Sequence, residues 1–231
     1  MRLLATAFLA AQMATRALGA QDVGHAPEAS PFRDLPYRQE LSLFGGYSNG
    51  AEGKAGVAPA GGPAIGVRYE IRIGGPAQFT ARLTRTMTDR TVLDPALAEN
   101  VRSLGTRAWP ITIADVGISL NLTGQKSWRR LVPSLAGGVG IASDFGKSGD
   151  PGGFEFGTPF AFTFGGGVRL ERDGPLQFRV DVADYLYQLD YPAAYTTAPT
   201  GSTPILSAGS STSEWTHNLM LSVGLSYRYS R

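Results

Sequence analysis

His217 is one of only two histidines in the chain, and its surroundings come closest to catalytic chemistry. Ser211, Ser213 and Glu214 lie just before it. A hydroxyl, a base and an acid therefore stand close together in sequence, as nucleophilic hydrolysis requires. In the alternating pattern described below, however, His217 falls on the apolar face beside Trp215. We therefore interpret His217 as a structural residue on that face.

Other chemistries find little support in the residue types. The chain has no cysteine, which excludes disulfides and cysteine-based zinc sites. Its glycine clusters are not followed by the Lys-Ser/Thr pair of a phosphate-binding loop. Asp144, Asp150 and Glu155 surround a glycine-rich loop but lack the carboxylate spacing of a calcium loop, so we interpret them as a solvated loop. The sequence predicts no metal site and no cofactor.

Ten charged residues have one feature in common. Each falls on the polar face of a segment that alternates polar and apolar residues. Charges of both signs can pair across a confined interior, and a buried charge without a partner is costly. We therefore predict a network of charged and polar side chains that fills a narrow lumen. Its predicted members are Glu40, Arg68, Glu70, Arg72, Arg82, Asp115, Arg169, Arg179, Asp181 and Arg228.

Eight segments with a period of two carry these charges. In one of them Ile65, Val67 and Ile71 share a face, and Arg68 and Arg72 share the opposite face. This is the pattern of a strand with two different faces. Most segments approach the roughly 9–11 residues of a tilted transmembrane strand. The segments are 40–47, 65–73, 78–84, 115–122, 134–141, 160–170, 176–183 and 215–229.

The connections between these segments alternate between long and short. The long ones cover about residues 48–63, 87–110, 143–158 and 187–214, and short turns lie between them. Outer-membrane barrels have this asymmetry, with short periplasmic turns and long extracellular loops. The even number of strands then predicts that both termini lie in the periplasm.

Three observations favour a barrel whose apolar face points outward to lipid. The polar face is rich in small residues, which suit the interior of an eight-stranded barrel. An arginine that faces lipid at the bilayer midplane costs about 2–4 kcal/mol, so arginines belong in the lumen. Aromatic residues cluster at strand ends, as in membrane interfaces. For the outer interface we predict Tyr47, Trp109, Tyr187, Tyr191 and Trp215, and for the inner one Trp128, Tyr227 and Tyr229.

Three local features depart from the simple pattern. Ile111 and Ile113 are out of phase with the rest of their segment, which predicts a bulge near Ala114 or a later strand start. Asp184 continues an apolar face and is expected at or beyond the membrane edge. The second long connection has helix-start and helix-stop signals at residues 94–105, which predict a short helix there.

The N-terminus has the features of a secretory signal peptide. A basic start, an uncharged apolar run and small residues predict cleavage after Gly19 or Ala20. We therefore predict a signal peptide at residues 1–20, an N-terminal periplasmic segment at 21–39 and the barrel at 40–231. The chain has 21 basic and 19 acidic residues. Arg2 and Arg16 leave with the signal peptide, so 19 of each sign remain, which does not favour nucleic-acid binding.

At this point the sequence resembles the eight-stranded outer-membrane β-barrel family of the OmpA/OmpX and opacity-protein type. The stretches that carry the resemblance are Phe44–Tyr47, Pro133–Gly140, Phe164–Arg169 and Leu221–Tyr229. It implies an all-β fold, an eight-stranded antiparallel up-and-down transmembrane β-barrel in a Gram-negative-type cell envelope. The last stretch resembles the C-terminal strand that the barrel-assembly machinery reads, although Ser230 and Arg231 follow its final tyrosine.

We therefore expect a non-enzymatic outer-membrane protein with a structural or surface-interaction role through four long extracellular loops. Its expected partners are outer-membrane lipid, lipopolysaccharide, the barrel-assembly machinery and an unspecified extracellular ligand, with no nucleic acid. Two alternatives stay open. One is an outer-membrane lipid-modifying enzyme that uses His217, although Leu219 stands where deacylases of that kind have a serine. The other is a soluble exported lipocalin-like carrier barrel.

Overall fold

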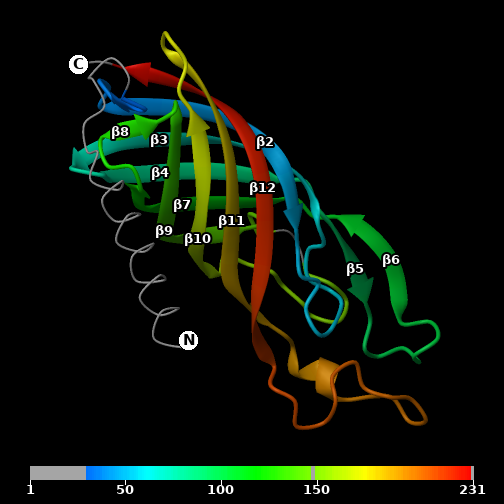
Figure 1. The fold of residues 1–231 in the computed structure, drawn as a ribbon. Coiled ribbons are helices and arrows are strands. Elements are labelled where there is room, and N and C mark those ends of the chain that lie inside the picture. The colour runs from blue at the N-terminus through cyan, green and yellow to red at the C-terminus, as the bar shows by residue number, and fades with distance from the viewer. Residues whose placement is uncertain (1–29, 147–148, 230–231) are drawn as a thin grey trace, which may run out of the picture.

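The computed structural model describes residues 30–146 and 149–229, which form strands and turns almost throughout (Figure 1). The predicted signal peptide and the first part of the predicted segment 21–39 lie outside the described residues. Within the described ranges, no helix is long and apolar enough to cross a membrane. Among the described residues, one 3-10 turn, η2 (Ala193–Thr196), lies in the last long connection.

Eight antiparallel strands form a closed up-and-down barrel, which confirms the predicted fold class. Each barrel strand pairs with the next barrel strand along the chain, and β12 pairs back onto β2. The short strand β8 (Lys126–Trp128) separates β7 from β9 in the sequence, but these two strands pair directly. The barrel strands are β2 (Gln39–Asn49), β3 (Gly62–Gly74), β4 (Ala77–Thr86), β7 (Ile111–Asn121), β9 (Leu131–Ser143), β10 (Phe160–Leu170), β11 (Leu176–Asp190) and β12 (Ser213–Tyr229).

The two faces of each barrel strand have opposite chemistry, as the alternation predicts. In β3, Val67 is 44% exposed on the outer wall and the adjacent Arg68 is 4% exposed. The same apolar covering continues around the ring. It includes Leu41, Leu83, Val116, Leu135, Phe162, Val180 and Val223. A soluble carrier barrel would place its apolar face inside, so this arrangement contradicts the lipocalin-like alternative and fits a wall that meets lipid.

Glycine permits an unusually close approach between β7 and β9. A Cβ at Gly117 would lie 2.2 Å from the carbonyl oxygen of Gly137, and one at Gly140 would lie 2.1 Å from that of Ala114. Both distances are too short for a side chain. The glycines therefore let the two strands pack closely where the barrel interior is narrow.

The predicted bulge near Ala114 is wrong, and β7 does not start late. Its register with β4 and β9 is continuous, so Ile111 and Ile113 share the inward face with Asp115. Both isoleucines are buried in an apolar cluster at one end of the lumen. The phase change in the sequence therefore reflects a lumen that is polar in its middle and apolar at that end.

The predicted helix at residues 94–105 is also wrong. The second connection instead forms a hairpin of β5 (Asp89–Leu93) and β6 (Ser103–Ala108), which projects beyond the barrel (Figure 1). The Asp94 carboxylate accepts the backbone N–H of Ala96 and caps a turn rather than a helix. Two further short strands, β1 (Phe32–Asp34) and β8 (Lys126–Trp128), pair with each other at the opposite end.

Candidate functional site

The interior of the barrel is the candidate site, and it lies between two different ends. The loop mouth is the end with the four long connections, and the turn mouth is the end where β2 begins and β12 ends. All ten residues predicted for the lumen lie on inward faces, buried or partly buried. They come from seven of the eight barrel strands, so long-range packing alone brings them together.

Arg179 on β11 is the centre of the charged network. Its Nε donates to both carboxylate oxygens of Asp181 at 3.0 and 2.8 Å. Its Nη1 contacts Glu70 and lies 3.5 Å from Glu40. Asp181 also accepts a hydrogen bond of 3.1 Å from Arg68. One guanidinium is therefore shared by three buried carboxylates, which makes it the residue whose loss uncovers the most charge.

Two smaller groups extend the network in both directions. Toward the loop mouth, Arg82 holds Asp115 through two parallel hydrogen bonds of 3.0 and 2.9 Å. Toward the turn mouth, Arg169 donates to Glu40 at 2.7 Å and to Glu171 at 2.9 Å. Glu171 was not predicted, although it lies two residues beyond Arg169 and so continues the same inward face.

Side chains fill the space around this network. A hollow beside Arg68, Arg82 and Arg179 measures about 20 Å³, which is about the room for a single water. Eight strands leave an interior just wide enough to be filled by side chains. In the described part of the chain, the middle of the lumen thus holds paired charges.

The segment before β2 folds into the turn mouth. The buried Tyr37 donates its hydroxyl to Glu171 at 3.2 Å. Burial raises the pKa of this phenol well above its ordinary value, so it stays a donor. Three guanidinium groups surround the ring at 5.9, 5.2 and 4.9 Å, from Arg72, Arg169 and Arg228. Tyr37 therefore closes this mouth by stacking against cations.

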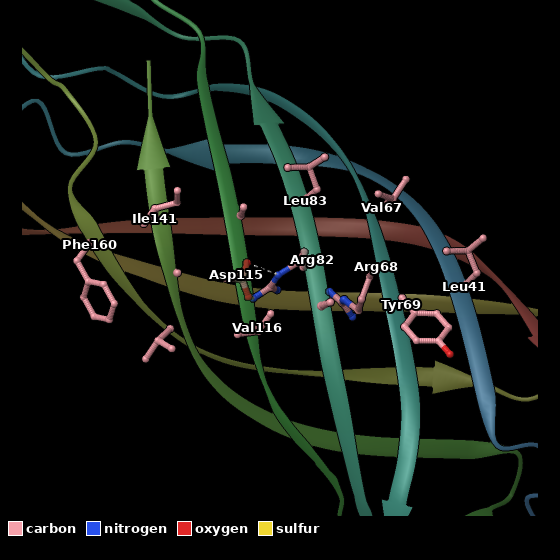
Figure 2. A pocket seen from close by; sticks show the side chains of 14 residues that line it. Leu41, Val67, Arg68, Tyr69, Arg82, Leu83, Asp115, Val116, Ile141 and Phe160 are labelled. Carbon is pink, nitrogen blue, oxygen red and sulfur yellow. Dashed lines mark hydrogen bonds and ion pairs between the residues drawn. The ribbon is translucent and has the colours of Figure 1, made fainter. Parts of the chain in front are cut away.

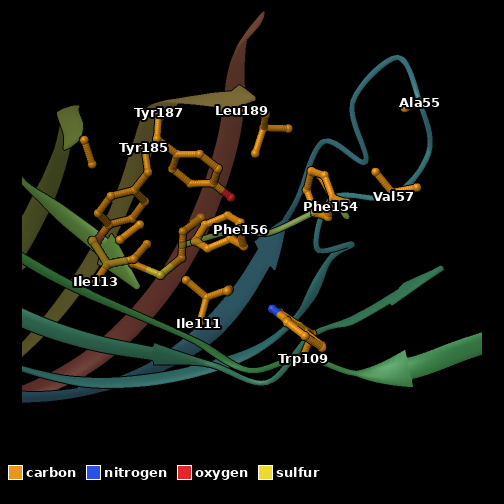
Figure 3. Packing of buried hydrophobic residues seen from close by; sticks show 14 of the residues in the cluster. Ala55, Val57, Trp109, Ile111, Ile113, Phe154, Phe156, Tyr185, Tyr187 and Leu189 are labelled. Atoms are coloured by element: carbon orange, nitrogen blue, oxygen red, sulfur yellow. The ribbon is translucent and has the colours of Figure 1, made fainter. Parts of the chain in front are cut away.

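The long connections pack into a single cap over the loop mouth. Apolar side chains from all four of them join one buried cluster with the upper parts of β7 and β11 (Figure 3). At its centre Arg90 of β5 pairs with Asp150, and both side chains are 0% exposed. The guanidinium also stacks 4.1 Å from the Trp109 ring centre and 5.0 Å from that of Phe154. These contacts join the second connection to the third.

The cap corrects two sequence interpretations. Tyr47 and Trp215 are exposed on the outer wall, but Trp109, Tyr187 and Tyr191 are buried in the cap and do not mark the outer interface.

Of the three acidic loop residues predicted to be solvated, Glu155 is exposed, but Asp144 and Asp150 are buried. Asp150 pairs with Arg90, and the buried Asp144 accepts the indole N–H of Trp109 at 3.0 Å. Among the described residues, no group of three or more His, Cys, Asp or Glu side chains could hold a metal ion.

His217 lies on the outer wall near the loop mouth, where the sequence predicted it. Its Nδ1 lies 2.6 Å from Asp184 on the adjacent strand, a partner that sequence spacing did not reveal. Asp184 also accepts the backbone N–H of Asn218 at 3.0 Å. An acid therefore orients the imidazole, as in hydrolases. No hydroxyl group in the described ranges is hydrogen bonded to His217.

Comparisons with known proteins find similarity in structure and not in sequence. No family model matches the chain, and no curated protein matches it significantly. The crystal structure of Neisserial surface protein A is similar with a TM-score of 0.50 and 9% identity, over 83% of this chain and 97% of that one.

Two further solved structures cover 84% of this chain. They are the outer membrane protein OprG from Pseudomonas aeruginosa, with a TM-score of 0.47, 10% identity and 98% of that chain covered, and Ail of Yersinia pestis, with 0.36, 15% and 100%. The chain is an eight-stranded antiparallel transmembrane β-barrel, with the fold of Neisserial surface protein A.

Proposed function

We propose that this chain is a non-enzymatic outer-membrane protein with a structural or surface-interaction role through its four long loops. One observation carries the proposal: an apolar outer wall encloses a charge-paired lumen that packed side chains close at both mouths. Such an interior offers no path to a solute, whereas the wall and the cap offer surfaces. The function therefore lies on the outside of the barrel.

The orientation follows from the asymmetry of the two ends. Outer-membrane barrels have long loops outside the cell and short turns in the periplasm. We place the loop mouth outside and both termini in the periplasm. The C-terminal strand presents Tyr227 and Tyr229 outward, with ring centres 5.0 Å apart, which supports recognition by the barrel-assembly machinery. The balanced charge gives no reason to expect a nucleic-acid partner.

The cap supports a role in surface contact. Its loops share a buried ion pair and an aromatic cluster, so a partner would meet a preformed surface rather than four separate flexible loops. The β5–β6 hairpin projects beyond the barrel (Figure 1) and carries exposed Val101 and Leu104 near its tip. This hairpin is our first candidate for the contact with an extracellular ligand.

A lipid-modifying enzyme is the second candidate, because Asp184 orients His217 on the outer wall. We favour the non-enzymatic role, since acyl transfer by a histidine–acid pair also needs a nucleophile and donors for the oxyanion. No hydroxyl group is hydrogen bonded to His217 in the part of the chain that the structure describes.

Cell fractionation and bilayer recording test the proposal together. We expect the protein in the outer-membrane fraction, and no stable open channels when the purified barrel is inserted in a planar bilayer. The charge-paired lumen and the Tyr37 closure are the physical reasons. Large, long-lived conductance steps would contradict the closed lumen, and recovery in the periplasmic wash would contradict the membrane location.

A further inference from the structure

Between β4 and β7, the outer wall near the loop mouth has a short polar row directly above an apolar one. Arg85 on β4 pairs in register with Thr112 on β7, whereas its partner on β3 is the exposed, apolar Ile65. Two residues further along these strands toward the turn mouth, Leu83 pairs with Ala114, which in turn pairs with Ile141 on β9. Both rows face outward, since they alternate with the lumen residues. On β4 and β7 the outward residues therefore change from polar to apolar within two positions along the strand.

The apolar row belongs to a groove in the outer wall. This groove has a volume of about 600 Å³. Ala81 and Ala114 are, after Gly140, the smallest residues of its lining. Larger side chains such as Leu83, Val67 and Ile141 line the same groove (Figure 2). A hollow lined by aliphatic and aromatic groups on a lipid-facing wall has the shape and chemistry to hold an acyl chain.

Arg85 sits at the loop-mouth edge of this groove without an acidic partner. Its Nη1 donates to the Thr112 hydroxyl at 2.5 Å, and its guanidinium lies 6.0 Å from the Phe145 ring centre. No carboxylate in residues 30–146 or 149–229 forms an ion pair with it. By contrast, five of the six arginines in the lumen network form an ion pair with a carboxylate, Arg72 being the exception. Arg85 therefore presents its charge to the membrane.

Phe145 gives a second sign that this edge lies at a membrane interface. Its side chain is 73% exposed and its φ is +57°, a left-handed conformation that is uncommon for a bulky residue. Outer-membrane barrels carry girdles of aromatic residues at both membrane interfaces. An outward arginine costs little at that depth and about 2–4 kcal/mol at the midplane.

We propose that the groove and Arg85 bind one molecule of lipopolysaccharide through its lipid A part. An acyl chain lies along Ala81 and Ala114, and a lipid A phosphate accepts hydrogen bonds from Arg85. The proposal rests on the proposed function, which places the loop mouth on the extracellular side. Lipid A offers phosphate and several acyl chains together, which matches a cation above an apolar groove.

Native mass spectrometry of the detergent-solubilised full chain, titrated with lipid A, tests the site. We expect a one-to-one complex that Arg85→Gln weakens about tenfold, the effect of losing one charge-assisted hydrogen bond. Ala114→Phe should weaken it similarly by filling the groove. Lipid A without phosphates should bind the wild-type protein as weakly as bisphosphorylated lipid A binds Arg85→Gln.

Two variants serve as matched controls. Arg172 stacks 5.3 Å from the outward Phe178 at the turn-mouth end, so Arg172→Gln removes a similar charge from the other leaflet. Val180→Phe adds an aromatic ring to the outer wall away from the groove. Both should bind lipid A like the wild type. Each variant is first checked for a folded barrel by its altered gel migration without boiling.

Several results would overturn the inference. Equal binding by wild type and both groove variants would do so, as would equal binding of phosphatidylglycerol or of lipid A without phosphates. In those cases an outer-membrane location of the protein would leave the proposed function standing. Recovery of the protein outside the outer membrane would instead refute the proposed function itself.

Discussion

Arg179→Met lowers the free energy of unfolding of the barrel by about 3–5 kcal/mol, the usual cost of removing one partner from a buried ionic group. The reason is that Arg179 is shared by Asp181, Glu70 and Glu40, all of which stay buried. The loss of the guanidinium leaves their negative charges close together in a low-dielectric interior. Urea unfolding of the barrel in lipid vesicles, followed by tryptophan fluorescence, measures the change.

Two comparisons make this result specific. Arg33→Met removes an arginine whose side chain is 62% exposed and whose carboxylate partner is 4.0 Å away, so it should change stability by less than about 1 kcal/mol. Arg179→Lys keeps a charge but not the planar fork, so it should recover only part of the loss. Equal stability of the wild type and Arg179→Met would show that the lumen charges are not coupled as described.

Arg90→Met opens the cap without unfolding the barrel. Asp150 would be left buried without its cation, and the stacking of Arg90 on Trp109 and Phe154 would be lost. The local cost is again about 3–5 kcal/mol, but it falls on loops outside the barrel pairing. We expect faster cleavage of the loops by an added protease on intact vesicles, with unchanged gel migration of the unboiled protein.

The hairpin itself provides the matched control for this prediction. Arg107 pairs in register with Arg90 across β5 and β6, but its side chain is exposed, so Arg107→Met should leave proteolysis unchanged. The double variant Arg90→Met/Asp150→Leu removes both charges and should recover much of the protection. Cleavage of the single variant at the wild-type rate would mean that the ion pair does not hold the cap.

The barrel was predictable from the sequence because its signal is local. A strand between lipid and a polar lumen must alternate, so Val67 and Arg68 reveal their opposite faces through their types alone. The charged members of the lumen could be named for the same reason. Their partners could not, since the Arg179–Glu70 contact joins residues 109 positions apart.

The cap was not predictable, because an aromatic residue looks the same at a membrane interface and in a buried cluster. Both Trp109 and Tyr187 lie outside the strand segments that the alternation predicts, as interface residues do, yet the folding of four loops covers them. The change of phase at Ile111 and Ile113 predicts a bulge, but its real cause is that both side chains point inward into the apolar cluster. An apolar residue on an inward face indicates the point where the lumen meets the cap.

The central claim is that apolar side chains face lipid while polar side chains face the lumen, and the absence of cysteine allows a direct test. Val223 is 60% exposed and the adjacent Ser222 is 1% exposed on β12. Single variants Val223→Cys and Ser222→Cys in vesicles are treated with a thiol reagent dissolved in the lipid. We predict rapid labelling at position 223 and none at 222. Labelling at 222 with protection at 223 would contradict the inside-out arrangement.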